Sequence, residues 1–250
     1  MVATMERATR AQRASVRAER TRTLILEAAE KVFAEKGFAA ARLEDVAEHV
    51  GIRRASIVYY YRDKRELYDA VLSNLFGGLL LRLHAAFAGS RSIEERIEGA
   101  IGAWVDYVAQ RPALARILLR EIADATPAAR PKVVDHAKPI LDAMDAIIRD
   151  GQRRGIFEPI DPIHLASTVG GATVFFVSAT PLLGADWPFD PLSVDQLAAH
   201  RREVLRIVRR LLGVKSPRLA KRTGPARNAE SVEIGTQKQQ RTSDREKGEA

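Results

Sequence analysis

The amino-acid sequence predicts an all-α fold, in which an N-terminal three-helix domain of the helix-turn-helix type precedes a larger helical domain. Apolar residues recur every three or four positions in nearly every segment, and the alternation typical of strands is not sustained. Glycine, proline, aspartate and serine stand where these periodic segments begin or end. With 250 residues, 46% of them hydrophobic, the chain can bury a substantial core.

The helix-turn-helix domain is expected over residues 21–72. Its first helix should end at Gly37, where a left-handed conformation is favoured. A short second helix follows and closes at Gly51, and a third runs from about 54 to 60. Asp63 can cap a fourth helix. A short helix, a glycine turn and a second short helix form the arrangement that presents a helix to DNA.

Five further helices are expected in the larger domain, residues 73–213. Their expected ranges are about 92–109, 112–124, 131–153, 161–182 and 193–212. Residues 165–185 carry no charge, but their serine, threonine and glycine content favours a buried helix over a membrane span. Residues 1–20 should form a basic flexible arm, and residues 214–250, which are polar and charged, a disordered basic tail.

Composition excludes several classes of function. The chain has no cysteine, so it has neither disulfides nor cysteine-ligated zinc, which is compatible with the cytoplasm. Its five histidines are dispersed and no catalytic motif is present, so we expect no enzyme activity, metal site or cofactor. The net charge is +8, and most of the surplus lies in residues 1–74 and 214–250, which suggests contact with a polyanion.

Two arginines begin the third helix, where it would enter a major groove. The guanidinium groups of Arg53 and Arg54 can each donate two parallel hydrogen bonds to guanine. Ser56 is small enough to approach a base edge or a phosphate. Tyr61 follows Ile57 by one helical turn and should pack inward.

A second set of side chains should position the protein on the DNA backbone. The phenol groups of Tyr59 and Tyr60 and the ammonium group of Lys64 are expected to contact phosphates. Such contacts carry little sequence information.

Residues 21–72 resemble the N-terminal domain of TetR-family transcriptional regulators, with matching spacings and no gap. The matching features are Ile25-Leu26, Ala28-Ala29, Phe33, Gly37-Phe38, Asp45-Val46-Ala47, Gly51-Ile52, Ser56-Ile57, Tyr59, Tyr61, Lys64 and Leu67. The resemblance implies that Arg54, Ala55 and Ser56 read bases. The chain departs from the family at Ala41-Arg42, where a small hydroxyl residue or pair is usual, so Arg42 is expected to replace the lost cap contact with a direct phosphate contact. It also departs at Arg53, where serine or threonine is usual.

The resemblance also implies a ligand-responsive regulator, a repressor released from a palindromic operator by a small effector. It implies a homodimer formed through helices 161–182 and 193–212, and a ligand pocket in the larger domain. A largely apolar cavity with a few polar anchors would suit a hydrophobic or amphipathic effector. Candidate pocket residues, for each of which core packing is the competing interpretation, are Trp104, Tyr107, Arg120, Glu121, Thr168 and Phe175.

Two alternatives from other classes compete with this interpretation. One is a nonspecific, architectural nucleic-acid protein dominated by its basic ends, and the other an all-helical enzyme or ligand carrier. The sequence does not specify the operator, the regulated genes, the effector or the sign of regulation, nor whether the arm and tail contact DNA.

Overall fold

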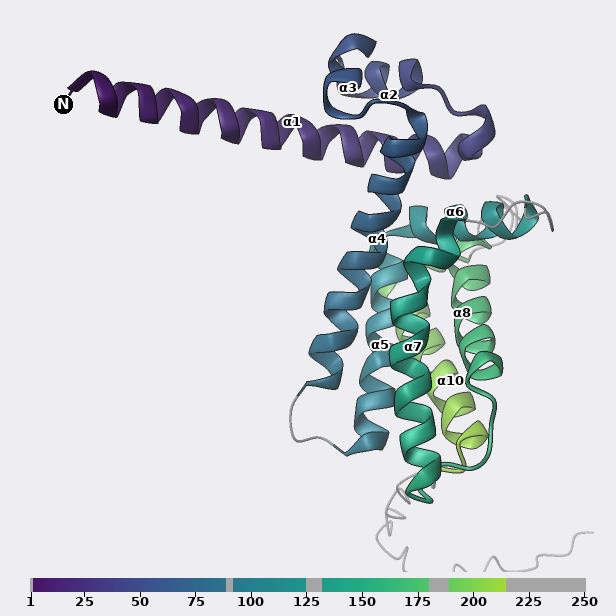
Figure 1. Cartoon of the computed structure of the whole chain (residues 1–250). Helices are drawn as coiled ribbons and strands as arrows, with labels where there is room; N and C mark the ends of the chain where they lie inside the picture. Colours follow the sequence, from purple (N-terminus) through teal and green to yellow (C-terminus); the bar gives the residue numbers. More distant parts are fainter. Residues whose placement is uncertain (1, 89–91, 125–131, 180–188, 215–250) are drawn as a thin grey trace, which may run out of the picture. The chain divides into compact units, whose positions relative to one another are not determined.

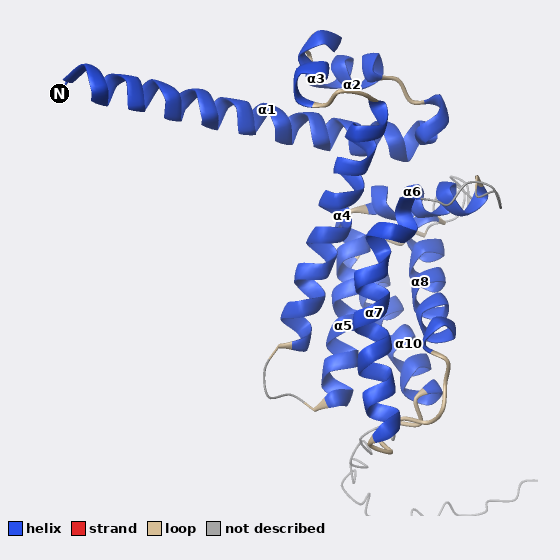
Figure 2. Ribbon diagram, in the orientation of Figure 1, coloured by secondary structure: helices blue, strands red, loops and turns tan. Residues whose placement is uncertain are grey.

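The computed structural model describes residues 2–88, 92–124, 132–179 and 189–214, and every regular element in these ranges is a helix (Figures 1 and 2). The helices are α1 (Val2–Ala40), α2 (Leu43–Val50), α3 (Arg54–Tyr60), α4 (Lys64–Phe87), α5 (Ile93–Gln110), α6 (Pro112–Ala123), α7 (Lys132–Arg153), α8 (Pro162–Ser178) and α10 (Val194–Leu211). The predicted all-α class is confirmed. The expected tail, from residue 215 onward, lies outside the described residues.

Helices α1, α2 and α3 share a core with the first turns of α4. Apolar side chains from all four helices are buried there, among them Ile25, Val46, Ile57 and Leu67. The ring of Tyr68 packs edge-on against Phe33 at a centroid distance of 4.8 Å. This core fixes the orientation of α3, whose inner face is buried.

The beginning of α1 differs from the flexible arm that we expected over residues 1–20. Residues 2–20 are helical and continue directly into the helix that packs in the core. The other end agrees with the sequence, because the backbone leaves helical geometry at Gly37 (φ 74°, ψ 169°). A positive φ of this size is adopted readily by glycine alone.

The larger part of the described chain is a helical bundle to which the rest of α4 belongs (Figure 1). Helices α5 and α7 pack against α4, and α10 packs against both α5 and α8. A second apolar cluster joins them, with Ile97, Ile148, Leu165 and Val208 buried at its centre. The observed helices match the five expected ranges closely, except that α8 ends at Ser178 rather than at residue 182.

Helix α4 is the one helix in the described part of the chain that is long and apolar enough to cross a membrane. Length and composition alone give this result, and the core helix of a globular protein meets the same criteria. Val71, Leu72, Leu75 and Leu79 of α4 are buried in the protein core. We therefore interpret α4 as a core helix that connects the two parts of the fold.

Candidate nucleic-acid interface

The turn between α2 and α3 is closed by a glycine in the left-handed conformation. Gly51 has φ 74° and ψ 33°, and its amide donates to the Glu48 carbonyl at 3.1 Å. The amide of Ile52 donates to the Ala47 carbonyl at 3.0 Å. This pattern satisfies the last carbonyls of α2 and sets the direction in which α3 begins.

The side of α3 away from the core forms a basic and aromatic surface. Arg53, Arg54 and Ala55 are exposed, and the Tyr59 side chain is 83% exposed. Tyr60 is half-buried, and its ring meets that of Tyr59 edge-on at 5.2 Å. Ser56 of the same helix is half-buried. The name recognition surface is used below for the six residues Arg53, Arg54, Ala55, Ser56, Tyr59 and Tyr60.

Two buried side chains hold the opposite side of α3. Ile57 is fully buried, and Tyr61, which follows the helix, is 1% exposed, as the sequence predicted. The guanidinium of Arg22 on α1 lies 5.2 Å from the centre of the Tyr61 ring. The recognition surface therefore projects from a helix whose inner face is fixed.

One member of the recognition surface has an ionic partner within the protein. The Nε atom of Arg54 lies 2.9 Å from a carboxylate oxygen of Glu44 on α2, and both side chains are well exposed. An exposed pair of this kind contributes little to stability. Its main effects are to orient the guanidinium and to place a negative charge beside the recognition surface.

Arg42 stands at the N-cap of α2 and is exposed, as a phosphate contact requires. Its side chain does not cap the helix. Instead, the Asp45 carboxylate accepts a hydrogen bond from the Arg42 amide at 2.9 Å and pairs with Lys36 at 2.8 Å. The hydrogen bond from Lys36, followed by that from the Arg42 amide, holds the pKa of Asp45 below its usual value. An acidic residue three positions after an N-cap, here Asp45, is the sequence pattern that indicates a hydrogen bond back to the N-cap amide.

Lys64 is placed differently from the phosphate contact expected for it. Its ammonium group donates to the carbonyls of Phe38 at 2.7 Å, Ala39 at 3.0 Å and Ala41 at 2.9 Å. An ammonium group has three donors, so all of them are engaged in this arrangement. Lys64 thus joins the start of α4 to the chain at the end of α1, and a phosphate contact would require these bonds to break.

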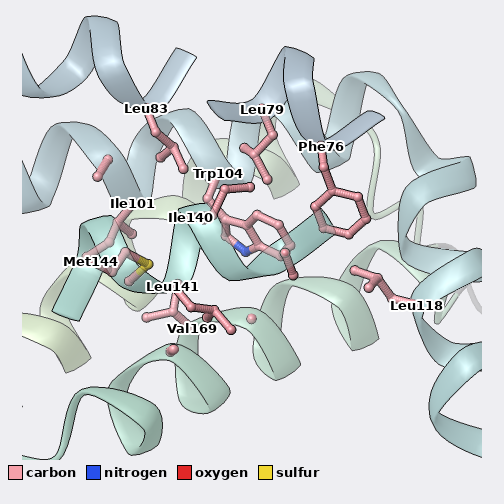
Figure 3. A pocket seen from close by; sticks show the side chains of 14 residues that line it. Phe76, Leu79, Leu83, Ile101, Trp104, Leu118, Ile140, Leu141, Met144 and Val169 are labelled. Carbon is pink, nitrogen blue, oxygen red and sulfur yellow. The ribbon is translucent and has the colours of Figure 1, made fainter. Parts of the chain in front are cut away.

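A cavity of about 160 Å³ lies in the larger domain between α4, α5, α7 and α8 (Figure 3). Its lining is almost entirely apolar, and α6 contributes Leu118. The lining residues are Phe76, Leu79, Leu83, Ala100, Ile101, Trp104, Leu118, Ala137, Ile140, Leu141, Met144, Ala166, Val169 and Gly170.

Of the six residues expected to bind a ligand, Trp104 alone lines this cavity. Tyr107 is buried and donates to the Leu75 carbonyl at 2.7 Å. Thr168 is exposed and donates to the His164 carbonyl of its own helix at 2.7 Å, and Phe175 is 63% exposed. The residues that do line the cavity are apolar helix residues. Their periodicity shows that they face inward, but it does not distinguish a cavity wall from a packed core.

Arg120 and Glu121, also expected in the pocket, connect α6 to the helix-turn-helix domain. Arg120 donates to the carbonyls of Ala34, at 3.0 Å, and Glu35 on α1. Glu121 accepts a hydrogen bond from the Tyr68 hydroxyl on α4 at 2.6 Å. Burial, and then this carboxylate, raise the pKa of Tyr68, so the phenol stays protonated.

A third connection lies at the start of α6, and no local sequence pattern indicates it. Arg111 forms an ion pair with Glu30 on α1, and the Glu30 side chain is only 11% exposed. The same guanidinium reaches the hydroxyl of Tyr107 at 3.4 Å. Helix α6 is therefore attached to α1 and α4 by polar side chains and faces the cavity through Leu118.

Comparison with known proteins agrees with this geometry. Residues 25–71 match the family model described as bacterial regulatory proteins, tetR family, and residues 94–208 match that of the tetracyclin repressor-like C-terminal domain. The transcriptional regulator RutR of Escherichia coli K12 is 30% identical over 164 residues, which cover 64% of this chain and 76% of RutR. The transcriptional repressor SCO4008 of Streptomyces coelicolor is 31% identical, covering 58% and 71% of the two chains.

Solved structures share the fold at lower identity. FadR of Bacillus subtilis, in complex with stearoyl-CoA, has a TM-score of 0.60 at 19% identity and covers 74% of this chain and 96% of its own. SCO4942 of Streptomyces coelicolor has a TM-score of 0.58 at 23% identity, covering 77% and 98%. The helix-turn-helix geometry, both family models and the relatives agree: this chain belongs to the TetR family of DNA-binding transcriptional regulators, which are not enzymes.

Proposed function

We propose that this TetR-family protein is a homodimeric repressor, acting in the cytoplasm, that binds a palindromic operator through α3. The recognition surface carries this proposal, because it is exposed, basic and aromatic on a helix with a buried inner face. Arg53 and Arg54 would read guanines in the major groove, with Ala55 and Ser56 at neighbouring base edges. Phosphates would be contacted by the tyrosine hydroxyls of the recognition surface and by Arg42.

A dimer through α8 and α10 is supported by the apolar side chains that these helices leave exposed. A soluble protein seldom leaves a group of large apolar residues exposed unless another surface covers it. Gly171 and Ala172 of α8 are also exposed, and residues this small allow a second helix to approach closely. The large exposed residues are Ile163, Phe175, Val194, Ile207 and Leu211.

The apolar cavity supports regulation by a hydrophobic or amphipathic effector. The FadR of Bacillus subtilis is solved with stearoyl-CoA, which is amphipathic. In this chain α6 reaches the cavity through Leu118 and holds α1 through Arg120. An effector that favours a different position of α6 would shift α1, and with it the separation of the two recognition surfaces in the dimer. Operator binding requires a separation of roughly 34–36 Å or a multiple of it.

Selection of bound sequences from a random duplex library, at physiological salt, tests this proposal. We expect a palindromic motif with guanine in each half-site, preferred over random DNA by about 10³-fold or more. Arg53→Ala and Arg54→Ala should each relax the guanine preference. Arg62→Ala removes a comparable, 84% exposed charge outside the recognition surface and should leave the preference unchanged. No enriched motif, with binding that vanishes as salt rises, would favour the nonspecific basic protein instead.

A further inference from the structure

The two arginines at the start of α3 differ in their surroundings. Arg53 forms no ion pair with another described residue. Arg54 has a carboxylate oxygen of Glu44 2.9 Å from its Nε atom. Glu44 lies in the first turn of α2, which packs beside α3 (Figure 1). The recognition surface therefore carries one arginine whose charge is unopposed and one whose charge is largely balanced by a carboxylate.

The ion pair leaves Arg54 accessible to a partner from outside the protein. The Arg54 side chain remains 60% exposed although Glu44 lies against it. A guanidinium has five N–H donors, and a single carboxylate cannot engage all of them. Because an exposed pair contributes little to the stability of the fold, its main consequence lies in what Arg54 can bind.

A phosphate and a guanine edge meet this ion pair differently. A phosphate carries a full negative charge, so Glu44 repels it over about the same range at which Arg54 attracts it. The O6 and N7 atoms of guanine are neutral acceptors, which take hydrogen bonds from a guanidinium at short range. The Glu44 carboxylate therefore weakens a phosphate contact of Arg54 much more than it weakens a guanine contact.

This difference matters because phosphates dominate binding to DNA of random sequence. Where no guanine lies opposite, a long charged side chain at the start of α3 can turn to the nearest phosphate, as Arg53 is free to do. A repulsive group that penalises the wrong contact raises specificity at the expense of affinity. Glu44 is placed to act in this way on Arg54.

We propose that Glu44 is a specificity-determining residue, which keeps Arg54 from binding phosphates and leaves it to read guanine. The inference rests on the proposed reading of the operator by α3 and deepens it. It gives a role in DNA recognition to a residue of α2 whose charge has the same sign as that of DNA.

Glu44→Gln tests this inference, with Glu48→Gln as the matched control. Glu48 follows Glu44 by one turn on the same face of α2, is exposed, and forms no ion pair with another described residue. Both glutamates are exposed, so neither substitution should disturb folding. Each variant of the full chain is titrated with the selected operator and with a random duplex, over a series of salt concentrations.

Once Glu44 is replaced, Arg54 should add one phosphate contact per subunit on random DNA. The slope of log K against log salt concentration should then steepen by about 0.9 per subunit. Two such contacts in a dimer tighten random binding about 20-fold at physiological salt, against about two- to fivefold for the operator. The preference for the operator should accordingly fall about four- to tenfold. Glu48→Gln should change both duplexes equally, by less than about twofold.

A further variant separates the ion pair from its charge. Glu44→Gln added to Arg54→Ala should leave the salt slope for random DNA unchanged, because no arginine is released. An unchanged operator preference in Glu44→Gln, an equal slope change in Glu48→Gln, or a slope change that persists without Arg54 would each overturn the inference. If selection yields no operator, the proposed function fails, and the random-duplex titrations still decide whether Glu44 keeps Arg54 from phosphates.

Discussion

Replacement of Lys64 by methionine would remove the ammonium group that joins α4 to the end of α1, while it keeps most of the aliphatic stem. The wild-type group donates to three carbonyls at 2.7 to 3.0 Å. Two of these contacts are partly buried and the one to Ala39 is exposed. The substitution therefore leaves two carbonyls, those of Phe38 and Ala41, with restricted access to water.

The size of the effect follows from these contacts. A hydrogen bond to a charged group contributes about 1.5–3 kcal/mol net when it is buried, and much less where water replaces it. With two partly buried contacts, we expect Lys64→Met to lower the free energy of unfolding by about 2–3 kcal/mol. For a chain of this length that loss corresponds to a fall in Tm of about 4–12 °C.

Urea unfolding and operator titration together distinguish this role from a phosphate contact. Arg53→Ala is the matched control, because Arg53 is exposed and should affect DNA binding but leave stability within about 0.5 kcal/mol. If Lys64→Met instead left stability unchanged and reduced the salt dependence of binding by about one phosphate contact per subunit, the structural role would be refuted.

Three further predictions concern charge and assembly. Glu44→Gln should strengthen operator binding about two- to fivefold, because it removes a negative charge and a competing partner of Arg54; equal affinity in a titration at low salt would contradict this. The folded pKa of Asp45 is lowered, so its stabilising effect is present above the unfolded value of 3.8 and is lost as pH falls below it. The difference in urea midpoint between Asp45→Asn and wild type should accordingly shrink as pH falls from 5 to 3, and a constant difference would count against the pair with Lys36. Phe175→Asp should yield a monomer in analytical ultracentrifugation and weaken operator binding at least tenfold, whereas an intact dimer would exclude α8 from the interface.

The helices and the recognition surface could be predicted from the sequence because their signals are local. Apolar periodicity, Gly37, Gly51 and the Asp63 cap all act within a few residues of the helix that they define, and each stands where expected. The inward position of Tyr61 follows from its spacing after Ile57. Even the exposure of the arginines at the start of α3 is a consequence of this short-range pattern.

The partners of long polar side chains could not be predicted in the same way. Lys64 bonds to carbonyls up to 26 residues earlier in the chain, and Arg120 to carbonyls up to 86 residues earlier. Such contacts depend on how helices pack and have no local sequence signal. From its position at a helix start alone, Lys64 was expected to contact a phosphate, and its carbonyl partners could not be predicted. Glu121 looked like a pocket anchor for the same reason, although it accepts from Tyr68.

The sequence by itself determined the helical class, the helix-turn-helix and the family, because these depend on spacing along one chain. The tertiary structure decided which apolar residues line the cavity. A helix shows the same periodicity whether its apolar face meets a packed core or an empty volume. Only the packing of α4, α5, α7 and α8 against one another distinguishes the two.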